Sequence, residues 1–343
     1  MEKRNFTIKD IASMADVSRG TVDRVLNNRG KVSEKARRKV EEVLQRIDYR
    51  PNLIARTLKN HRPFTIWLLM PDYTNDRYWQ QMYQGVMDAY AEMEPFGIRI
   101  SSVRMGSTED AYYQDFSSVL QNSPDALVIV PFFTDTCFNL YRELEERKIP
   151  FVLLNSPIKD VNYGCFIGQD YFMSGRNAAY FMDILTRSVA PKRTILILHI
   201  GVQTENATHV EEKEIGFLDY FRERDASSTI EIIRFEAELD MGLLDYKLSK
   251  ADGLFITNSK THVAEDLLRK HPSVKIIGYD MIPENIELLR EGTIDILLNQ
   301  NPKLQGYHGI SIVTEYLLYQ REMPKNRLLP IDVLTKENVS GYL

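Results

Sequence analysis

Apolar residues recur at helical spacing through the first fifty residues and predict three short helices, over 8–15, 19–27 and 34–47. Ser18 stands before the second helix and Ser33 before the third, and serine is a preferred residue at helix N-caps. Only a tight turn separates the first helix from the second. Two short helices joined in this way are typical of a helix-turn-helix, so we expect a small three-helix head here.

From residue 64 onward the pattern changes to short apolar runs separated by amphipathic stretches. The runs expected to form strands are 65–70, 98–103, 126–130, 151–155, 163–167, 194–200, 230–235, 253–256, 275–279 and 295–298. Amphipathic helices are expected over 79–94, 136–147, 172–185, 211–222 and 304–319. Strands that alternate with helices are typical of parallel, doubly wound sheets with right-handed crossovers. The predicted fold class is α plus α/β, with a helical head followed by doubly wound parallel α/β structure.

One interval breaks this alternation. Between the runs 151–155 and 163–167 there is no helical stretch, only Ser156–Asn162. We therefore expect the chain to cross between two lobes near 156–162, and again near 300 and 322–330. The predicted domains are a head over 1–50, a hinge and linker over 51–63, and a two-lobed domain over 64–343.

The composition is that of a globular protein, with 343 residues, 43% hydrophobic and 27% charged. The only two cysteines, Cys137 and Cys165, stand apart, so neither a disulfide framework nor a zinc cluster is supported, and no metal or cofactor is expected. The N-terminal residues lack an apolar run, and no later run approaches the roughly 18 residues that a membrane span needs. We expect a cytoplasmic protein that does not enter a membrane.

The formal net charge of −5 conceals an asymmetry between the two parts of the chain. Residues 1–62 hold 16 basic and 8 acidic side chains, whereas the remaining residues hold 27 basic and 40 acidic ones. A basic head on an acidic body favours a polyanionic partner for the head alone. A solvated Lys/Arg-rich surface is the other interpretation that charge alone leaves open.

The head carries four motifs in order between Thr7 and Lys59: TIKDIA, V-S-x-x-T-V-x-R-V-L-N, V-S-x-x-x-R-x-x-V and Y-x-P-N-x-x-A-R-x-L. With these motifs at this spacing, the chain resembles the lactose/galactose repressor (LacI/GalR) family of bacterial transcription regulators. The resemblance implies a homodimer that binds a near-palindromic operator in double-stranded DNA. It also implies two lobes like those of periplasmic binding proteins, with a sugar-like effector between them that changes operator affinity allosterically, and a role in carbohydrate metabolism.

The resemblance also implies roles for residues of the head. Base readout falls to Arg19, Gly20 and Arg24, and each arginine is able to grip a guanine with two hydrogen bonds. The positions expected to contact phosphates and set register are Thr7, Ser18, Thr21, Asn27 and Lys31. Asp23 departs from the family pattern, which has a small hydroxyl residue there. A carboxylate near phosphate is unfavourable, so the resemblance does not carry the family's phosphate contact over to this position.

A short hinge helix is expected after Pro51, capped by Asn52. About two turns is too short for a stable isolated helix, so it is expected to form only when paired with the dimer mate on DNA. By resemblance, Leu58 wedges a base step in the minor groove and bends the duplex. The hinge residues singled out are Asn52, Ala55, Arg56 and Leu58.

Ligands of open α/β sheets sit beyond the carboxyl ends of the strands. Tyr78 and Trp79 follow the first strand, and aromatic faces next to polar groups suit a sugar. Where the family has R-x-x-G-F, this chain has Lys213 at the arginine position, which keeps the charge but loses the planar fork. The expected effector residues are Asp76, Tyr78, Trp79, Phe132, Asn155, Lys213, Asn258, Asp280 and Gln300.

Two other classes of function are the alternatives to a sugar-responsive regulator. An enzyme is not expected, because no nucleophile elbow, HExxH, Walker loop or GxGxxG follows a strand, and the six histidines are scattered. The nearer alternative is a regulator gated by a protein co-effector, as in the catabolite-control branch of the family. A polar, aromatic-floored cleft favours a sugar, whereas a blocked cleft beside a charged patch favours a protein.

Overall fold

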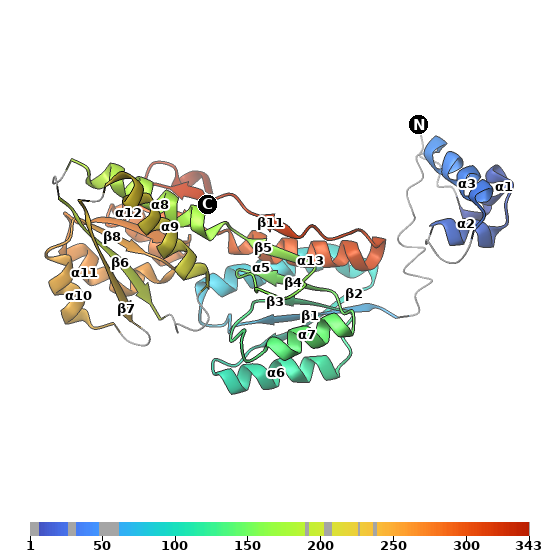
Figure 1. Ribbon diagram of the computed structural model, residues 1–343, viewed down its shortest axis with the longest axis horizontal. Coiled ribbons are helices and arrows are strands. Elements are labelled where there is room, and N and C mark those ends of the chain that lie inside the picture. Colours follow the sequence, from blue (N-terminus) through green and yellow to red (C-terminus); the bar gives the residue numbers. More distant parts are fainter. Residues whose placement is uncertain are drawn as a thin grey trace. The chain divides into compact units, whose positions relative to one another are not determined.

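The computed structural model describes residues 7–26, 32–47, 62–188, 192–201, 208–225, 227–235 and 239–342. The chain divides into two compact units, Met1–Pro63 and Phe64–Leu343 (Figure 1). Within the described parts, none of the helices combines the length and apolar character needed to cross a membrane.

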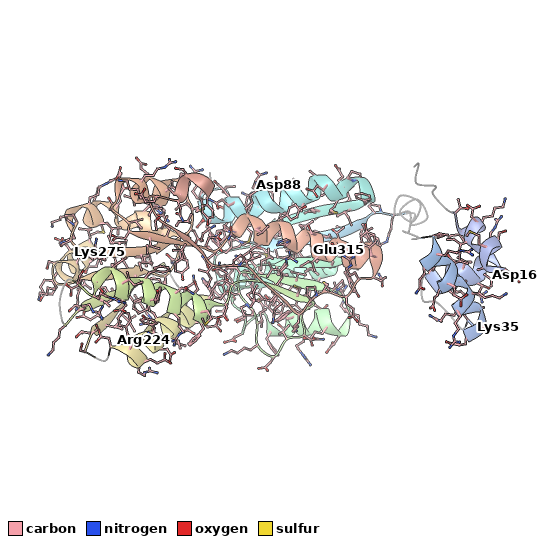
Figure 2. All side chains as sticks on the ribbon, turned by 90° about the horizontal axis from the view of Figure 1, so that it is seen from above. Asp16, Lys35, Asp88, Arg224, Lys275 and Glu315 are labelled. Carbon is pink, nitrogen blue, oxygen red and sulfur yellow. The ribbon has the colours of Figure 1, made fainter. Side chains whose placement is uncertain are left out.

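The head consists of the three expected helices, α1 (Ile8–Ala15), α2 (Arg19–Leu26) and α3 (Glu34–Arg46). Thr7 and Asp10 form a capping box at the start of α1, which satisfies backbone N–H groups that the helix itself cannot pair. The hydroxyls of Ser18 and Ser33 accept backbone N–H groups at the starts of α2 and α3. Ile11, Val22 and Val40, one from each helix, are fully buried and form the centre of the core. Charged side chains such as Lys35 and Asp16 project from the outside of the head (Figure 2).

The first lobe is a six-stranded parallel sheet in the order β11-β5-β4-β3-β1-β2. Its strands are β1 (Phe64–Met70), β2 (Ile98–Arg104), β3 (Ala126–Ile129), β4 (Phe151–Leu154), β5 (Cys165–Gly168) and β11 (Asn326–Leu328). The helices α5 (Arg77–Met93), followed by the short η1 (Glu94–Phe96), and α13 (Pro302–Tyr319) pack on one face. On the other face lie α6 (Glu109–Gln121) and α7 (Phe138–Glu146).

The second lobe has a sheet in the order β12-β10-β9-β8-β6-β7. Its strands are β6 (Thr194–Ile200), β7 (Thr229–Phe235), β8 (Gly253–Ile256), β9 (Lys275–Tyr279), β10 (Ile296–Asn299) and β12 (Asp332–Leu334). One face carries α8 (Tyr171–Thr186) and α9 (Thr208–Arg224). The other face carries α10 (Met241–Leu248), η3 (Lys260–Ala264), α11 (Glu265–Lys270) and α12 (Pro283–Glu291), and η4 (Val339–Tyr342) packs there through Val339.

The strand orders of the two lobes correspond position by position, so the two lobes are structural repeats of one topology. The sequence pattern did not predict this repeat. Five strands of each lobe are parallel, as expected for doubly wound sheets. The sixth strands differ: β11 runs parallel to β5, whereas β12 runs antiparallel to β10. The all-parallel expectation therefore fails at this one edge strand, which enters its sheet directly from the other lobe without a crossover helix.

The expected lobe crossing at 156–162 is wrong. β4 and β5 on either side of it pair in parallel within the first sheet, so the chain stays in the first lobe. The loop between them covers part of the sheet face, as a crossover helix would, because Ile158 and Val161 are buried in the core beneath the sheet. The first crossing instead follows β5, at residues 169–170. The second lies at 300–301 between β10 and α13, and the third at 329–331 between β11 and β12.

One side chain ties the three crossings together. Gln169, buried in the first crossing, donates from Nε2 to the carbonyl of Asn299 at 2.9 Å and to that of Pro330 at 2.7 Å. Asn299 precedes the second crossing and Pro330 lies in the third. The crossings are therefore held as one bundle, and the lobes meet around it.

Each lobe contains a helix pair whose backbones touch through two glycines. In the second lobe a β-carbon on Gly175 of α8 would lie 1.9 Å from the carbonyl oxygen of Lys213, and one on Gly216 of α9 would lie 2.0 Å from that of Phe172. In the first lobe Gly85 of α5 and Gly306 of α13 make the matching approach. No side chain fits at these helix–helix contacts, so the glycines set the spacing of both helix pairs.

Candidate functional site

The three positions expected to read bases share one exposed face of α2. Arg19, Gly20 and Arg24 are exposed, whereas Val22 and Val25 face the core of the head. Gly20 leaves room beside Arg24, because a β-carbon built on it would lie 3.7 Å from Nη2 of that arginine. The N-terminal residues of a recognition helix meet base edges in the major groove, so this face offers the donors that readout needs.

The hydroxyl side chains expected at phosphates also organise the helix starts. Ser18 Oγ accepts the N–H of Thr21 at 3.1 Å and lies 2.9 Å from the hydroxyl of Thr21. The hydroxyl of Thr7 donates to Asp10 at 2.7 Å. Thr7 and Ser18 remain exposed. The other expected DNA residues, Asn27, Lys31, Asn52, Ala55, Arg56 and Leu58, lie outside the residues that the structure describes.

Lys213 of α9 is the centre of a fully buried polar cluster where the lobes meet. Its ammonium donates to the backbone carbonyl of Thr257 and to Oε1 of Gln300, both at 3.0 Å. It also lies 3.8 Å from the centroid of the Tyr279 ring, close enough for a cation–π interaction. An ammonium has three N–H donors, and two of them have oxygen acceptors here.

Asp280 joins this cluster through Gln300. The carboxylate of Asp280 accepts the backbone N–H of Gln300 at 3.0 Å and its side-chain amide at 2.7 Å. Asp280 follows β9 and Gln300 follows β10, and these neighbouring strands bring the two residues together. Gln300 thus bridges the buried carboxylate and the buried ammonium of Lys213.

Burial shifts both charged groups of the cluster. It lowers the pKa of Lys213 to about 7, although the carboxylate of Asp280 opposes the change. Burial also raises the pKa of Asp280 to about 6, against the favourable charge of Lys213 and the hydrogen bonds from Gln300. Both shifts have the sign expected for charges held in a low-dielectric interior.

The first lobe reaches this cluster through Asn155, which follows β4 with a positive φ of 67°. The Tyr78 hydroxyl donates to Oδ1 of Asn155 at 2.8 Å, and the Tyr171 hydroxyl donates to its backbone carbonyl. Gln305 of α13 accepts the N–H of Asn155 at 3.0 Å and donates to the carbonyl of Gln300 at 2.9 Å. A continuous hydrogen-bonded path therefore runs from the first lobe to Lys213.

Two of the expected aromatic residues pack against the first lobe beside Tyr78. The ring of Trp79 packs edge-on against those of Tyr78 and Phe132, with centroid separations of 4.8 Å and 6.1 Å respectively. Trp79 and Phe132 are half-buried against the core of this lobe. The three rings form an aromatic wall next to the polar cluster.

Two other expected effector residues bind backbone groups of neighbouring segments. Asp76 caps α5 by accepting the N–H groups of Tyr78 at 2.9 Å and Trp79 at 3.3 Å. Asn258 donates to the carbonyl of Ile200 at 2.8 Å and accepts the N–H of Lys260 at 3.1 Å. In this structure both residues shape the loops around the site.

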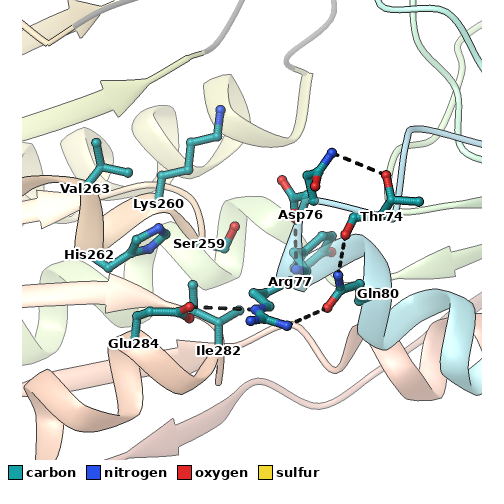
Figure 3. A pocket seen from close by; sticks show the side chains of 12 residues that line it. Thr74, Asp76, Arg77, Gln80, Ser259, Lys260, His262, Val263, Ile282 and Glu284 are labelled. Carbon is teal, nitrogen blue, oxygen red and sulfur yellow. Dashed lines mark hydrogen bonds and ion pairs between the residues drawn. The ribbon is translucent and has the colours of Figure 1, made fainter.

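A cavity of about 470 Å³ opens between the lobes next to the cluster (Figure 3). The first lobe lines it with residues 74–78 and Gln80, and the second lobe lines it with Ser259, Lys260, His262, Val263, Ile282 and Glu284. Arg77 spans the two sides, with Nε 3.7 Å from Glu284 and Nη1 donating to Gln80 at 3.1 Å. Gln81 also crosses between the lobes, by donating to the carbonyl of Met281 at 2.9 Å. The walls are polar, and Asp76 and Tyr78 join the cavity to the expected site.

The sequence identified Tyr78, Asn155, Lys213, Asp280 and Gln300 of this cluster, and the structure brings all five into one hydrogen-bonded set. It did not identify the residues that connect them, Thr257, Tyr171, Tyr279 and Gln305. Thr257 follows β8, Tyr279 is the last residue of β9, and Tyr171 follows the first crossing. Gln305 carried the weaker signal, an uncharged polar residue in the first turn of α13.

A helix-turn-helix head with exposed arginines, followed by two α/β lobes that meet at a polar site, defines a DNA-binding protein with a body built like a ligand receptor. The chain belongs to the LacI family of DNA-binding transcription regulators. Residues 7–52 match the family described as bacterial regulatory proteins, lacI family, and residues 66–321 match the periplasmic binding protein domain.

Individual relatives agree with this assignment. The chain is 26% identical over 283 residues to the ribose operon repressor of Lactococcus lactis, covering 80% of this chain and 81% of that one. It is 43% identical over 177 residues to catabolite control protein A of Staphylococcus epidermidis, covering 51% of each. The crystal structure of a putative LacI transcriptional regulator from Bacteroides fragilis matches 82% of this chain and 100% of that one, with 25% identity and a TM-score of 0.76.

Proposed function

We propose that the chain is a repressor of carbohydrate genes whose affinity for its operator is set by a sugar or sugar derivative bound between the lobes. The observation that carries the proposal is the interlobe site, where a 470 Å³ polar cavity adjoins the buried cluster and is lined from both lobes. A ligand that contacts both lobes stabilises one arrangement of them over another. Such differential binding is what allows an effector to change affinity elsewhere, typically by about 1–3 kcal/mol.

The chemistry of the cavity supports a ligand rich in hydroxyl groups. Its walls supply acceptors from Asp76 and Glu284 and donors from Lys260 and Gln80, and Tyr78 also lines it. A sugar offers both donors and acceptors, whereas an apolar ligand would leave these groups unpaired. The name of the Lactococcus lactis relative, ribose operon repressor, supports the same class of metabolism. An enzymatic role is not proposed.

For the head, we infer direct readout by Arg19 and Arg24, with Gly20 permitting close approach to the DNA. Thr7, Ser18, Thr21, Asn27 and Lys31 hold the register on phosphates. A homodimer formed through the α/β lobes presents two heads to the half-sites of a near-palindromic operator in the cytoplasm. The hinge residues Asn52, Ala55, Arg56 and Leu58 then pair in the minor groove and bend the duplex.

Arg24→Ala is expected to relax base preference at one position of each half-site, because a bidentate arginine–guanine pair contributes about 1–3 kcal/mol of discrimination. Lys31→Ala is the matched comparison, since a phosphate contact weakens all sequences alike and its loss lowers the salt slope by about 1. Selection of binding sites from randomised DNA, followed by salt titration, measures both effects. Identical selectivity in the two variants would refute the division between readout and positioning.

A sugar that binds the cleft is expected to raise the unfolding temperature, because at a concentration of 100 Kd a ligand stabilises the folded state by about 2.7 kcal/mol. Thermal unfolding is measured with D-ribose, D-arabinose, D-glucose, D-gluconate and D-glucose 6-phosphate. Gln300→Leu removes the bridge between Asp280 and Lys213 and should abolish the shift, whereas Gln84→Leu on the exposed face of α5 should retain it. Absence of any shift across the panel would contradict a sugar effector and favour a protein co-effector.

A further inference from the structure

A buried histidine connects three elements of the second lobe. His199, in β6, is 2% exposed. Its Nε2 lies 2.6 Å from a carboxylate oxygen of Glu214 on α9, and its Nδ1 lies 2.8 Å from the hydroxyl of Thr257 after β8. Because a carboxylate only accepts hydrogen bonds, Nε2 of His199 carries a proton. The hydrogen bond between Nδ1 and the Thr257 hydroxyl fixes the ring and the threonine together.

Glu214, at one end of this connection, is also bound by a residue at the protein surface. Arg234 of β7, which is partly exposed, donates to the same carboxylate oxygen of Glu214 that His199 contacts. Although burial opposes it, the hydrogen bonds and charges of His199 and Arg234 keep the pKa of Glu214 below its usual value. The ionised carboxylate is thereby anchored at two points, and α9 is fixed to the sheet at Glu214.

The near end of the connection touches the ammonium of Lys213. The backbone carbonyl of Thr257 accepts Lys213 Nζ at 3.0 Å, while the side chain of the same threonine is held by His199. Lys213 and Glu214 are consecutive residues of α9, so two hydrogen-bonded contacts fix the same helix turn. Glu214 is hydrogen-bonded to His199, and Lys213 is hydrogen-bonded to the carbonyl of Thr257.

We propose that His199, acting with Glu214 and Thr257, is the positioning residue that holds the Lys213 ammonium at the interlobe site. The inference rests on the proposed function, in which the buried cluster around Lys213 adjoins the effector cavity. His199 reaches no ligand itself, since Thr257 and Glu214 occupy both ring nitrogens. It fixes the acceptor of Lys213 and the helix that carries Lys213, so it acts on the site through both.

The arrangement also explains why a polar triad is retained inside the sheet. A buried polar group is stable only when it is hydrogen-bonded, and leaving one partner unpaired is destabilising. All three members are satisfied here, and Thr257 is additionally within 3.4 Å of the Leu198 carbonyl. An apolar residue at position 199 would fill the space but would release both Thr257 and Glu214.

The test measures Lys213 directly and needs no effector. The full-length protein is treated with acetic anhydride, and the acylation rate of Lys213 is measured by peptide mass spectrometry. His199→Phe and Thr257→Val are each expected to raise that rate roughly fivefold. Each removes the His199–Thr257 hydrogen bond, and the loss of about 1 kcal/mol loosens the carbonyl that holds Lys213 and exposes its neutral amine, the form that the anhydride acylates, to that extent. Thr257→Ser keeps the hydroxyl and is expected to restore the wild-type rate.

His271→Phe is the matched control, because His271 also lies 2.6 Å from a carboxylate, that of Asp245, in the same lobe but away from Lys213. It should leave Lys213 acylation unchanged while lowering stability to a similar degree. Wild-type rates in both His199→Phe and Thr257→Val, with folding verified by circular dichroism, would overturn the proposal. An equal increase in His271→Phe would also overturn it, since the effect would then reflect general destabilisation.

Operator binding with and without D-ribose separates this inference from the proposed function. A wild-type protein that responds to the sugar and a His199→Phe variant that binds operator but responds at least several-fold less support the positioning role. A wild-type protein that responds to no sugar of the panel contradicts the proposed function. The acylation rates still decide whether His199 positions Lys213.

Discussion

Gly216→Ala is expected to lower the free energy of unfolding by about 3 kcal/mol, at the upper end of the usual cost of overpacking a well-packed interface. The added β-carbon would lie 2.0 Å from the carbonyl oxygen of Phe172 and 3.2 Å from the backbone nitrogen of Arg176. Both atoms belong to the backbone of α8, so no side chain can turn aside. The helices must separate, and Lys213, one turn earlier on α9, moves with them.

Urea unfolding measures the loss of stability, and acylation of Lys213 measures the displacement of α9. Gly242→Ala is the control, because its β-carbon would have nothing nearer than Asp240 Oδ1 at 3.5 Å. At that exposed helical position alanine is favoured over glycine by up to about 1 kcal/mol, so a small gain is expected. Equal stability of the two variants would show that the α8–α9 contact tolerates separation and that the glycine does not set it.

Lys213→Met is expected to abolish a rise in stability with pH that the wild-type protein shows above about pH 7. The ordinary pKa of lysine, 10.5, falls to about 7 in the folded protein through burial. Between these values the unfolded chain binds a proton at Lys213 and the folded chain does not, so stability increases with pH across that window. Methionine carries no proton in either state, and the increase should vanish.

Asp280 gives a dependence of opposite sign at lower pH. Burial raises its pKa from 3.8 to about 6, so the folded chain binds a proton that the unfolded chain has released, and stability falls as pH rises between these values. In Lys213→Met the neighbouring cation is absent, which raises the pKa of Asp280 further and extends this fall upward. Urea unfolding from about pH 4 to about pH 10 records both changes.

Lys250→Met removes an exposed lysine from the same lobe and serves as the comparison. It should retain the rise above about pH 7 that depends on the buried ammonium. If Lys213→Met retains the same rise, the buried ammonium does not titrate in that window and its low pKa is wrong.

Local patterns predicted most of the fold because they have local causes. The helices of the head follow from Thr7, Ser18 and Ser33 as caps and from apolar spacing, and the strands follow from short apolar runs. The prediction of a lobe crossing at 156–162 is wrong because a segment without a helix can still connect two neighbouring strands of one sheet. Burial of Ile158 and Val161 shows that a loop can cover a sheet face, and that burial depends on contacts distant in sequence.

The candidate site was predictable in its members but not in its connections. Strand ends identified Asp280 and Gln300, and the family motif identified Lys213. The bonds among them depend on the register of neighbouring strands and on the approach of α13, which brings Gln305 to Asn155 across 150 positions of sequence. His199 resembled an ordinary core histidine in the sequence, and only the positions of Glu214 and Thr257 reveal what it holds.

The three crossings between the lobes have a consequence for biosynthesis. The first lobe lacks α13 and β11 until the chain has been made through Leu328, although its other elements are complete by Gly168. Until then, the sheet face that receives Ile310, Val313 and Leu317 is uncovered, including Val128 and Leu154. Nascent chains that expose such surfaces are prone to aggregate. A stop codon shortly after Gln300 would therefore leave two unfinished lobes, and neither lobe corresponds to a contiguous gene fragment.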